Sequence, residues 1–495
     1  MKMKVILGLL IIFLVSTFLF TSCRPKQTID VSKDTKTEEL RSPNVPEWHK
    51  NAVLYEVNLR HYTSENTFKS FEAQVPRLKE MGIDILWFMP IFPISKEKRK
   101  GPLGSPYSVA DYFNTNPDYG TIDDFKHLVE VIHQAGMHVI LDWVPNHTGW
   151  DNPWIKEHPD WYTKDKNGNI TDPMDPNTGK SWGWTDVADL NYDNAEMRLK
   201  MIDALKFWVV ETNIDGYRMD VAPAVPSDFW IQATDSLYAI RPLFMLSEGE
   251  NPELVNNGSF IADYAWEMHH TFNEIAASQG ASRIKRANVV QGNLKEGEAE
   301  VHIKTATDID TVLAKKRKQY TQGYQMQFTS NHDENSWSDT EFARLGEAHK
   351  TFAVLAATME GIPLIYTGQE SAMDKKLEFF KKDSITWGEY IYAPFYKTLF
   401  DLKHRNKALW NGTHGGQMKK VTTGNDQNVY AFCREKDGDK VVVILNLSAE
   451  KQSATLGSEI LAGQYNNVFS GTNKVLNAGT SFEVNPWEYM VYSNR

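Results

Sequence analysis

Between residues 52 and 368 the chain alternates short apolar runs with longer stretches whose apolar positions recur every three or four residues. The first pattern is typical of buried strands and the second of amphipathic helices. Strands covered by helices on both faces are apolar without alternation, which favours a parallel sheet. Eight strand–helix units in succession predict an α/β fold of the (β/α)8 TIM-barrel type, with a doubly wound open sheet as the alternative. The apolar runs are 52–57, 83–90, 137–144, 214–220, 242–248, 260–266, 324–330 and 362–368.

Two segments depart from this alternation. Residues 148–190, after the third apolar run, are rich in Trp, Asn, Asp, Gly and Pro and have no helical period. They predict a small inserted domain, and long insertions of this kind are usually functional. Residues 411–495 contain short apolar runs separated by turn signals such as Asp437-Gly438, which predict an antiparallel β-sandwich. The barrel is then expected over 47–147 and 191–410.

The N-terminus has the composition of an export signal, because two lysines precede an apolar stretch that ends in small residues. The sequence FTSC at residues 20–23 resembles a lipobox. We therefore expect a signal peptide over 1–22, lipidation at Cys23 and a flexible tether over 23–46, with an uncleaved anchor helix as the alternative. Basic rather than acidic residues follow Cys23, which favours an exported, lipid-anchored protein that faces the periplasm of a bacterium rather than the cell surface.

Charge and cysteine content narrow the class of protein. The formal net charge is −11, and removal of Lys2 and Lys4 with the signal peptide changes it to −13. An acidic exported protein without blocks of basic residues is not expected to bind nucleic acid. Cys433 is the only cysteine besides Cys23, so stability must come from a large core rather than from internal disulfides. Aromatic residues make up 12% of the chain, which suits the binding of sugar rings.

Polar residues gather where the predicted strands end. In a barrel of this type the active site lies at the carboxyl ends of the strands. A single Asp or His there usually caps a helix or braces a loop, but ionisable groups at several strand ends predict a site. These groups are Asp142, Asn146 and His147 after the third run, Arg218 and Asp220 in the fourth, Glu248 in the fifth, and His332 and Asp333 after the seventh, with Tyr107 and Asp111 in the loop before the third.

The chemistry of these groups favours glycoside cleavage. The chain lacks HExxH, GxSxG, a Walker loop and a GxGxxG motif after a strand, which argues against the enzyme classes that use them. Two carboxylates on facing strands can cleave a glycosidic bond, one by attack and one by protonation. Arg218 is expected to keep Asp220 ionised as the nucleophile, and Glu248 is expected to be the acid with a raised pKa. Asp333 is then expected to bind hydroxyl groups of the sugar.

The strings DWVPNH, GYRMD, MLSEGE and FTSNHD, in this order, resemble the α-amylase family, glycoside hydrolase family 13. NPDYGT, VADLNY and GIPLIYTGQE support the resemblance. It implies retaining cleavage of α-glucosidic bonds, with an α-glucan or malto-oligosaccharide as substrate. The resemblance also implies roles for the individual residues: Asp220 as nucleophile, Glu248 as acid/base, Asp333 as stabiliser, Tyr107 stacked on the sugar, and Asp142, His147, Arg218 and His332 in substrate binding.

The resemblance leaves several points open. The loop NLRHYTSENTFKS lacks a DxNxDG-like calcium loop, whereas Asn146 and Asp189 match residues that hold calcium in calcium-dependent amylases. Calcium is thus a possible cofactor, and no organic cofactor is expected. VAPAVP after Asp220 is similar to neopullulanases and cyclomaltodextrinases, but no N-terminal dimerisation domain is evident, which favours a monomer. An exo-acting α-glucosidase, a neopullulanase-like or cyclomaltodextrinase-like enzyme, a glucan transglycosylase and a non-catalytic glycan-binding barrel remain alternatives.

Overall fold

A computed structural model describes residues 41–175, 178–284 and 303–495. The predicted signal peptide, Cys23 and the tether up to residue 40 lie outside the described residues. None of the helices in the described ranges combines the length and the apolar character needed to cross a membrane.

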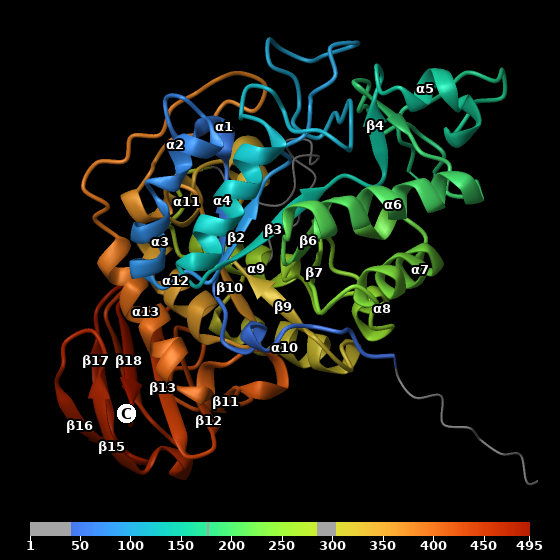
Figure 1. Ribbon diagram of the computed structural model, residues 1–495. Coiled ribbons are helices and arrows are strands. Elements are labelled where there is room, and N and C mark those ends of the chain that lie inside the picture. The colour runs from blue at the N-terminus through green and yellow to red at the C-terminus, as the bar shows by residue number, and fades with distance from the viewer. Residues whose placement is uncertain (1–40, 176–177, 285–302) are drawn as a thin grey trace, which may run out of the picture. The chain divides into compact units, whose positions relative to one another are not determined.

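Eight parallel strands close into a barrel, which confirms the predicted TIM barrel and excludes the open sheet (Figure 1). Each predicted apolar run contains one strand. Around the barrel the order is β1-β10-β9-β8-β7-β6-β3-β2, so consecutive barrel strands are neighbours. The strands are β1 (Leu54–Val57), β2 (Ile85–Phe88), β3 (His138–Trp143), β6 (Gly216–Met219), β7 (Phe244–Ser247), β8 (Ala262–Tyr264), β9 (Tyr324–Gln327) and β10 (Ile362–Tyr366).

Helices surround the strands, and α4 illustrates why they form. Thr121 accepts a hydrogen bond from the Asp124 N–H, and the Asp124 carboxylate accepts one from the Thr121 N–H, which closes a capping box. The helix then buries Phe125, Leu128 and Ile132 on one face against the barrel. The barrel helices are α1 (Leu59–Tyr62), α2 (Phe68–Glu72), α3 (Val75–Met81), α4 (Ile122–Gln134), α6 (Ala195–Thr212), α7 (Ser227–Tyr238), α8 (Pro252–Asn256), α9 (Trp266–Ser278), α10 (Ala306–Gln319), α11 (Glu341–Leu345), α12 (His349–Thr358) and α13 (Ala393–Arg405).

Alternate residues of the same strands build two cores. Outward residues such as Val139 and Leu141 pack with the helices, whereas inward residues such as Ile140 fill the barrel. Gly216, at the start of β6, is required by close packing, since a Cβ there would overlap the Phe244 carbonyl of β7. The close approach of β6 and β7 brings Arg218 opposite Leu246 in the ladder.

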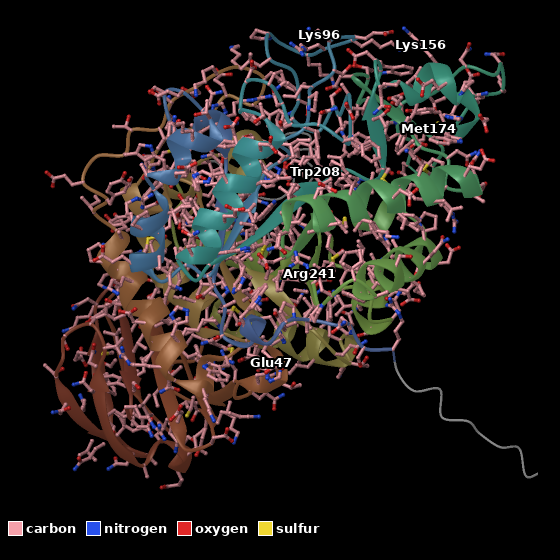
Figure 2. The ribbon with its side chains drawn as sticks, in the orientation of Figure 1. Glu47, Lys96, Lys156, Met174, Trp208 and Arg241 are labelled. Atoms are coloured by element: carbon pink, nitrogen blue, oxygen red, sulfur yellow. The ribbon has the colours of Figure 1, made fainter. Side chains whose placement is uncertain are left out.

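The inserted segment leaves and re-enters the barrel through a two-stranded antiparallel sheet, β4 (His147–Gly149) with β5 (Val187–Asp189). It carries the short helix α5 (Trp154–Glu157), and Lys156 and Met174 mark its position at the upper right of Figure 2. Trp154 and Trp161 are buried and lie 5.2 Å apart between ring centroids, so they form its small core. Trp184 is 37% exposed and does not join this core.

The C-terminal part is antiparallel, as predicted. A six-stranded sheet and a two-stranded sheet enclose a common core that contains Val429, Ile444, Ala454 and Phe482. The β12–β13 hairpin turns at Asp437 and Gly438, which both have positive φ, as a type I′ turn requires. The strands are β11 (Lys419–Val421), β12 (Val429–Lys436), β13 (Asp439–Asn446), β18 (Tyr489–Ser493), β15 (Gly463–Asn467) and β16 (Asn473–Leu476) in the larger sheet, and β14 (Gln452–Thr455) and β17 (Ser481–Val484) in the smaller.

Residues 41–46 differ from the expected flexible tether. Arg41 forms an ion pair with Asp235 at 2.6 Å and donates to the Thr234 hydroxyl at 2.6 Å. The Asn44 carbonyl accepts the Leu243 N–H at 2.9 Å. These contacts hold the segment against the barrel, because a guanidinium can satisfy several acceptors at once. Composition alone does not reveal such partners, which lie about 190 residues away in sequence.

Candidate active site

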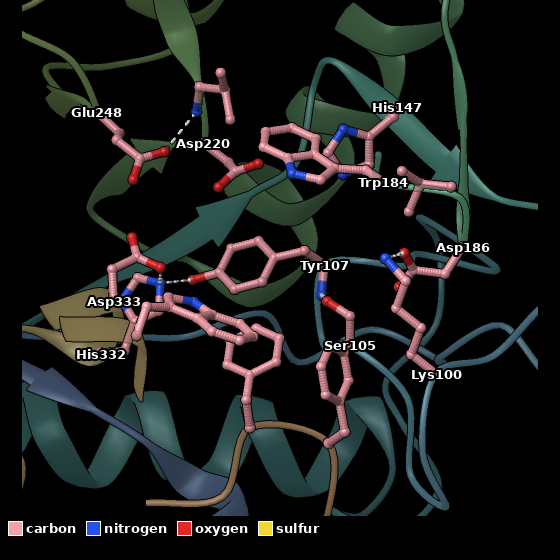
Figure 3. Close-up of a pocket in the computed structure, with 15 residues that line it drawn as sticks. Lys100, Ser105, Tyr107, His147, Trp184, Asp186, Asp220, Glu248, His332 and Asp333 are labelled. Carbon is pink, nitrogen blue, oxygen red and sulfur yellow. Dashed lines mark hydrogen bonds and ion pairs between the residues drawn. The ribbon is translucent and has the colours of Figure 1, made fainter. Parts of the chain in front are cut away.

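One cavity of about 460 Å³ is lined by six of the residues predicted from the sequence, namely Tyr107, His147, Asp220, Glu248, His332 and Asp333 (Figure 3). The other predicted residues, Asp111, Asp142, Asn146 and Arg218, are not among its lining residues. Asp220 follows β6, Glu248 follows β7, and Asp333 follows β9. Tyr107 and His147 complete this part of the wall, from the loop after β2 and from β4. A cavity of this size is within the usual range for small-molecule sites.

Arg218 is the centre of the charged network. Its side chain is fully buried, and Nη1 donates to Asp142 Oδ1 at 2.7 Å and to Asp220 Oδ1 at 2.9 Å. Its Nη2 lies 2.5 Å from Glu248 Oε1, and Nε donates to the Tyr264 hydroxyl. A buried guanidinium is tolerated because three carboxyl groups and the Tyr264 hydroxyl surround its nitrogen atoms. The predicted pairing of Arg218 with Asp220 is therefore part of a larger network.

The proton distribution between Asp220 and Glu248 is the reverse of the one expected from the sequence. Burial, together with the negative charge of Glu248, raises the pKa of Asp220 well above its usual value. Burial also acts to raise the pKa of Glu248, but Arg218 and the Val221 N–H at 2.7 Å outweigh it, so this pKa lies below its usual value. The two carboxyls titrate as a pair, and Glu248 is ionised first because it is closer to Arg218.

His332 and His147, both expected to bind substrate, differ in charge. Burial acts to lower the pKa of His332, but the charges of Asp333 and Glu56 outweigh it and raise the pKa to about 9. Its Nδ1 lies 2.5 Å from Glu56 Oε1 and its Nε2 2.7 Å from the Tyr107 hydroxyl. Burial lowers the pKa of His147 to about 4, so this imidazole is neutral near pH 7.

Three residues of the network were not predicted. Glu56 on β1 supports His332, Trp87 on β2 donates to Asp142 Oδ2 at 3.1 Å, and Tyr264 on β8 accepts from Arg218. Glu56 could have been found as the one charged residue in the apolar run 52–57. Trp87 and Tyr264 carry no such signal, because aromatic residues in apolar runs are usually core.

Aromatic side chains extend the wall of the cavity. The Phe379 ring lies parallel to Tyr107, at an angle of 6° and 6.3 Å between centroids. Trp337 packs on Phe379 at 4.9 Å and is 55% exposed. On the inserted segment, Trp184 lies 5.7 Å from His147, and Asp186 pairs with Lys100 at 2.8 Å. Exposed aromatic faces beside a cavity suit the apolar faces of sugar rings.

Asn146 and Asp189, the predicted calcium ligands, lie at opposite ends of the inserted segment, which the β4–β5 ladder brings together by pairing His147 with Asp189. Burial raises the pKa of Asp189 to about 6. Carboxylate and amide oxygens are of the kind that calcium prefers, but these two side chains offer fewer than the six to eight oxygens it takes. The remaining ligands would have to be backbone carbonyls and water.

Comparison with known proteins identifies the family. The family model "Alpha amylase, catalytic domain" matches residues 68–441. This chain belongs to the α-amylase family. Residues 418–491 also match the model "Maltogenic Amylase, C-terminal domain". As a member of the α-amylase family, the chain is a glycosidase of the α-amylase type.

Individual relatives are similar over most of the chain. "Alpha-amylase MalA" of Haloarcula japonica is 26% identical over 86% of this chain, which spans 60% of that protein. "Alpha-amylase 3" of Dictyoglomus thermophilum is 24% identical, with 83% of this chain and 88% of that protein aligned. The crystal structure of the "noncanonic maltogenic alpha-amylase AmyB" from Thermotoga neapolitana superposes with a TM-score of 0.75 at 28% identity, covering 90% of this chain and 98% of that one.

Proposed function

We propose that this chain hydrolyses α-1,4-glucosidic bonds in starch, maltodextrins or related α-glucans, with retention and through a covalent glycosyl-enzyme intermediate. The observation that carries the proposal is the convergence of Asp220, Glu248 and Asp333 on one cavity, two of them paired with the buried Arg218. Polar residues at neighbouring strand ends can lie close together by chance. Here, however, Asp220 and Glu248 both form ion pairs with the same guanidinium, that of Arg218.

In the proposed reaction, an Asp220 oxygen attacks the anomeric carbon while Glu248 gives its proton to the departing glycosidic oxygen. Water then attacks the glycosyl ester, and Glu248 takes the proton back. The first step needs the shared proton on Glu248, whereas the free site favours it on Asp220. Substrate must therefore shift the proton, and a sugar that displaces Glu248 from Arg218 would do this. Asp333 and the cationic His332 would bind hydroxyls of the reacting sugar.

Replacement of Asp220 by Asn tests the mechanism. Without the nucleophile, turnover of maltotriose should fall about 10⁴-fold or more, while binding measured by calorimetry persists. Asp111→Asn is the matched control and should keep turnover, because Asp111 does not line the cavity and its carboxylate instead accepts the Phe113 N–H of its own loop. Unchanged turnover in the Asp220 variant would contradict the assignment. A wild-type protein that binds glucans without cleaving them would instead favour the non-catalytic glycan-binding barrel.

The substrate within the α-glucans is best identified by a panel of soluble starch, pullulan, cyclodextrin and maltotriose, with product analysis over time. The cavity, flanked by Tyr107, Phe379, Trp337 and Trp184, suits short oligosaccharides. Internal products from starch favour endo-action. Glucose as the only product would indicate an exo-acting α-glucosidase, and rapid cleavage of cyclodextrin would indicate a cyclomaltodextrinase-like enzyme. Panose released from pullulan would indicate a neopullulanase-like enzyme, and products longer than maltotriose would indicate a transglycosylase.

The location proposed for the protein is the periplasmic side of a bacterial membrane, where the lipidated Cys23 anchors it. The order of basic, apolar and small residues before Cys23 supports this. The Cys23→Ser variant should lose labelling by fatty acid and remain at its precursor mass. Protease added to intact cells should not cleave the anchored enzyme, and cleavage there would indicate the cell surface instead.

Calcium at Asn146 and Asp189 and a monomeric state complete the proposal. If calcium binds there, adding calcium to the metal-free protein should raise the melting temperature of wild type but not of the Asp189→Asn variant. Equal shifts in both would exclude this site.

The monomeric state is tested separately. Light scattering during size-exclusion chromatography should give the mass of one chain.

A further inference from the structure

A second cluster of ligand-type side chains lies at the other end of the barrel from the cavity. His133 is in the last turn of α4, His138 is the first residue of β3, and Asp215 directly precedes β6. These positions are the amino ends of the strands, whereas the cavity lies at their carboxyl ends. The cluster therefore has no part in the proposed glycosidase chemistry.

The three side chains of this cluster lie close enough together to become ligands of one metal ion after small shifts. His133 Nε2 lies 2.7 Å from Asp215 Oδ2, and His138 Nδ1 lies 3.7 Å from Asp215 Oδ1. One ligand atom from each of the three residues lies within 4.8 Å of the others. In a tetrahedral zinc site with bonds near 2.0–2.1 Å, neighbouring ligand atoms are about 3.3 Å apart. Shifts of up to about 1.5 Å would bring all three to that spacing.

We propose that His133, His138 and Asp215 bind a zinc ion, with water as the fourth ligand. Two imidazoles and one carboxylate are typical of Zn²⁺, while calcium and magnesium prefer sites made of oxygen alone. The site would join α4, β3 and the segment before β6. Its role is structural, because the amino ends of the strands in TIM barrels serve stability.

The surroundings hold the ligands in place and leave them accessible. The Val139 N–H donates to Asp215 Oδ2 at 2.8 Å, and Trp48 stacks on His138 at 4.0 Å and 13°. Such contacts orient metal ligands. Side-chain exposures of 25%, 23% and 14% for His133, His138 and Asp215 allow an ion to enter from solvent.

The charges at this end of the barrel also permit a cation. Burial acts to raise the pKa of Asp215, but hydrogen bonds with His133 and His138 lower it below the usual range, so the ligand is ionised. Two bases at the same end of the barrel have other partners: Lys79 donates to the Gly136 carbonyl, and Arg241, labelled in Figure 2, donates to Asn213 Oδ1.

A simple ion pair between His133 and Asp215 is the competing explanation, and the chain contains a matched example of one. His404 Nε2 lies 2.7 Å from Asp84 Oδ2, the same separation as in the cluster, and Asp84 immediately precedes β2. Among the described residues, however, that pair is not part of a group of three histidine, cysteine or acidic ligands. His404→Gln is therefore the control variant, and His138→Gln is the test variant.

The experiment uses the full chain purified without a polyhistidine tag. Zn²⁺ is titrated against a chromophoric chelator, since the 14 histidines of the chain can also bind zinc weakly. We expect one site with a dissociation constant of micromolar or tighter. His138→Gln should weaken it at least tenfold, and His404→Gln should leave it unchanged. Zinc at about 100 times the dissociation constant should raise the melting temperature of wild type by roughly 3 °C.

Two further readouts distinguish the site from weak surface binding and from misfolding. Co²⁺ in place of zinc should give the intense visible absorption of tetrahedral coordination in wild type and His404→Gln only. Circular dichroism and retained glucan hydrolysis verify that His138→Gln is folded. The proposal is overturned if wild type has no site tighter than 100 µM, if His138→Gln binds as tightly as wild type, or if both variants lose zinc equally.

Discussion

Glu56, together with Asp333, determines the charge of His332. The Glu56 side chain is fully buried on β1, Oε1 lies 2.5 Å from His332 Nδ1, and Oε2 accepts the His332 backbone N–H at 3.3 Å. A carboxylate in this position stabilises the imidazolium. His332 can then donate from Nε2 to a sugar hydroxyl or to Asp333, whose Oδ1 lies 3.5 Å away.

We expect Glu56→Gln to narrow the pH range of activity on the alkaline side. The pKa of His332 is raised to about 9, so the stabilisation from its proton is complete below about 6.5 and is lost as the pH rises through 9. Without the charge of Glu56 this loss begins at lower pH. The alkaline limb of kcat/KM, measured from pH 5.5 to 9.5, should move down by about one pH unit or more.

Glu370→Gln is the control for this prediction, because Glu370 is an equally buried carboxylate that pairs with Arg77 instead of His332. It should cost stability without moving the alkaline limb. An unchanged limb in Glu56→Gln would show that another group titrates there.

The three catalytic carboxylates that the sequence identified share one property, namely a position at the end of an apolar run or a few residues after it. Asp220, Glu248 and Asp333 stand out in this way, and the fold brings them to one cavity. Which of Asp220 and Glu248 carries the proton could not be predicted, because it depends on their distances from Arg218. The guanidinium lies 2.9 Å from Asp220 and 2.5 Å from Glu248. Spacing in sequence does not contain that difference.

At the scale of elements, the segment after β1 is held by a lysine from the loop after β10. Lys382 Nζ donates to the Arg60 carbonyl at 2.6 Å and to the Thr63 carbonyl at 2.8 Å. The sequence indicated only that this segment lacks a calcium-loop motif. An ammonium group from about 320 residues away in sequence instead bridges two backbone carbonyls of this segment. Arg60 in turn donates to the Phe379 carbonyl at 2.7 Å, which links the segment to the aromatic wall.

We expect Lys382→Met to loosen this segment and the aromatic wall together. Two carbonyls lose a charged donor, which should lower the free energy of unfolding by about 1–2 kcal/mol. Hydrogen exchange of residues 58–66 and 377–387 should accelerate, and KM for maltotriose should rise more than kcat falls. The neighbouring Lys381→Met is the control, since Lys381 pairs with Glu378 at the surface. Equal exchange in both variants would contradict the bridging role.

Local sequence patterns predicted which strands and helices form, but they did not predict which residues those elements pack against. The β12–β13 hairpin was predictable because Asp437-Gly438 favours positive φ at both turn positions. By contrast, the tryptophans of the inserted segment look alike in sequence, yet Trp154 and Trp161 are core and Trp184 lines the cavity. Their division depends on how β4 and β5 orient the segment against the barrel.

At the scale of the molecule, the barrel and the C-terminal sandwich are joined through Arg434 of β12. This side chain is fully buried and donates to four carbonyls: Thr358 at 3.1 Å, Met359 at 2.7 Å, Trp410 at 2.9 Å and Gly416 at 2.7 Å. Burial lowers the pKa of Arg434 to about 10, so it remains charged near pH 7. The change from strand–helix alternation to short strands with turn signals predicted the boundary between the two parts. It did not predict that Arg434 joins them.

We expect Arg434→Met to weaken the coupling between the barrel and the sandwich. A methionine fills part of the volume but leaves four carbonyls without their donor, which should cost about 3–5 kcal/mol. Calorimetry of wild type should give one cooperative transition, and the variant should show an earlier transition for residues 411–495. Lys436→Met, on the same strand, removes one bond to the Thr413 carbonyl and should shift the melting temperature little. A single transition at the wild-type temperature in Arg434→Met would mean that apolar contacts across the boundary, rather than Arg434, couple the two parts.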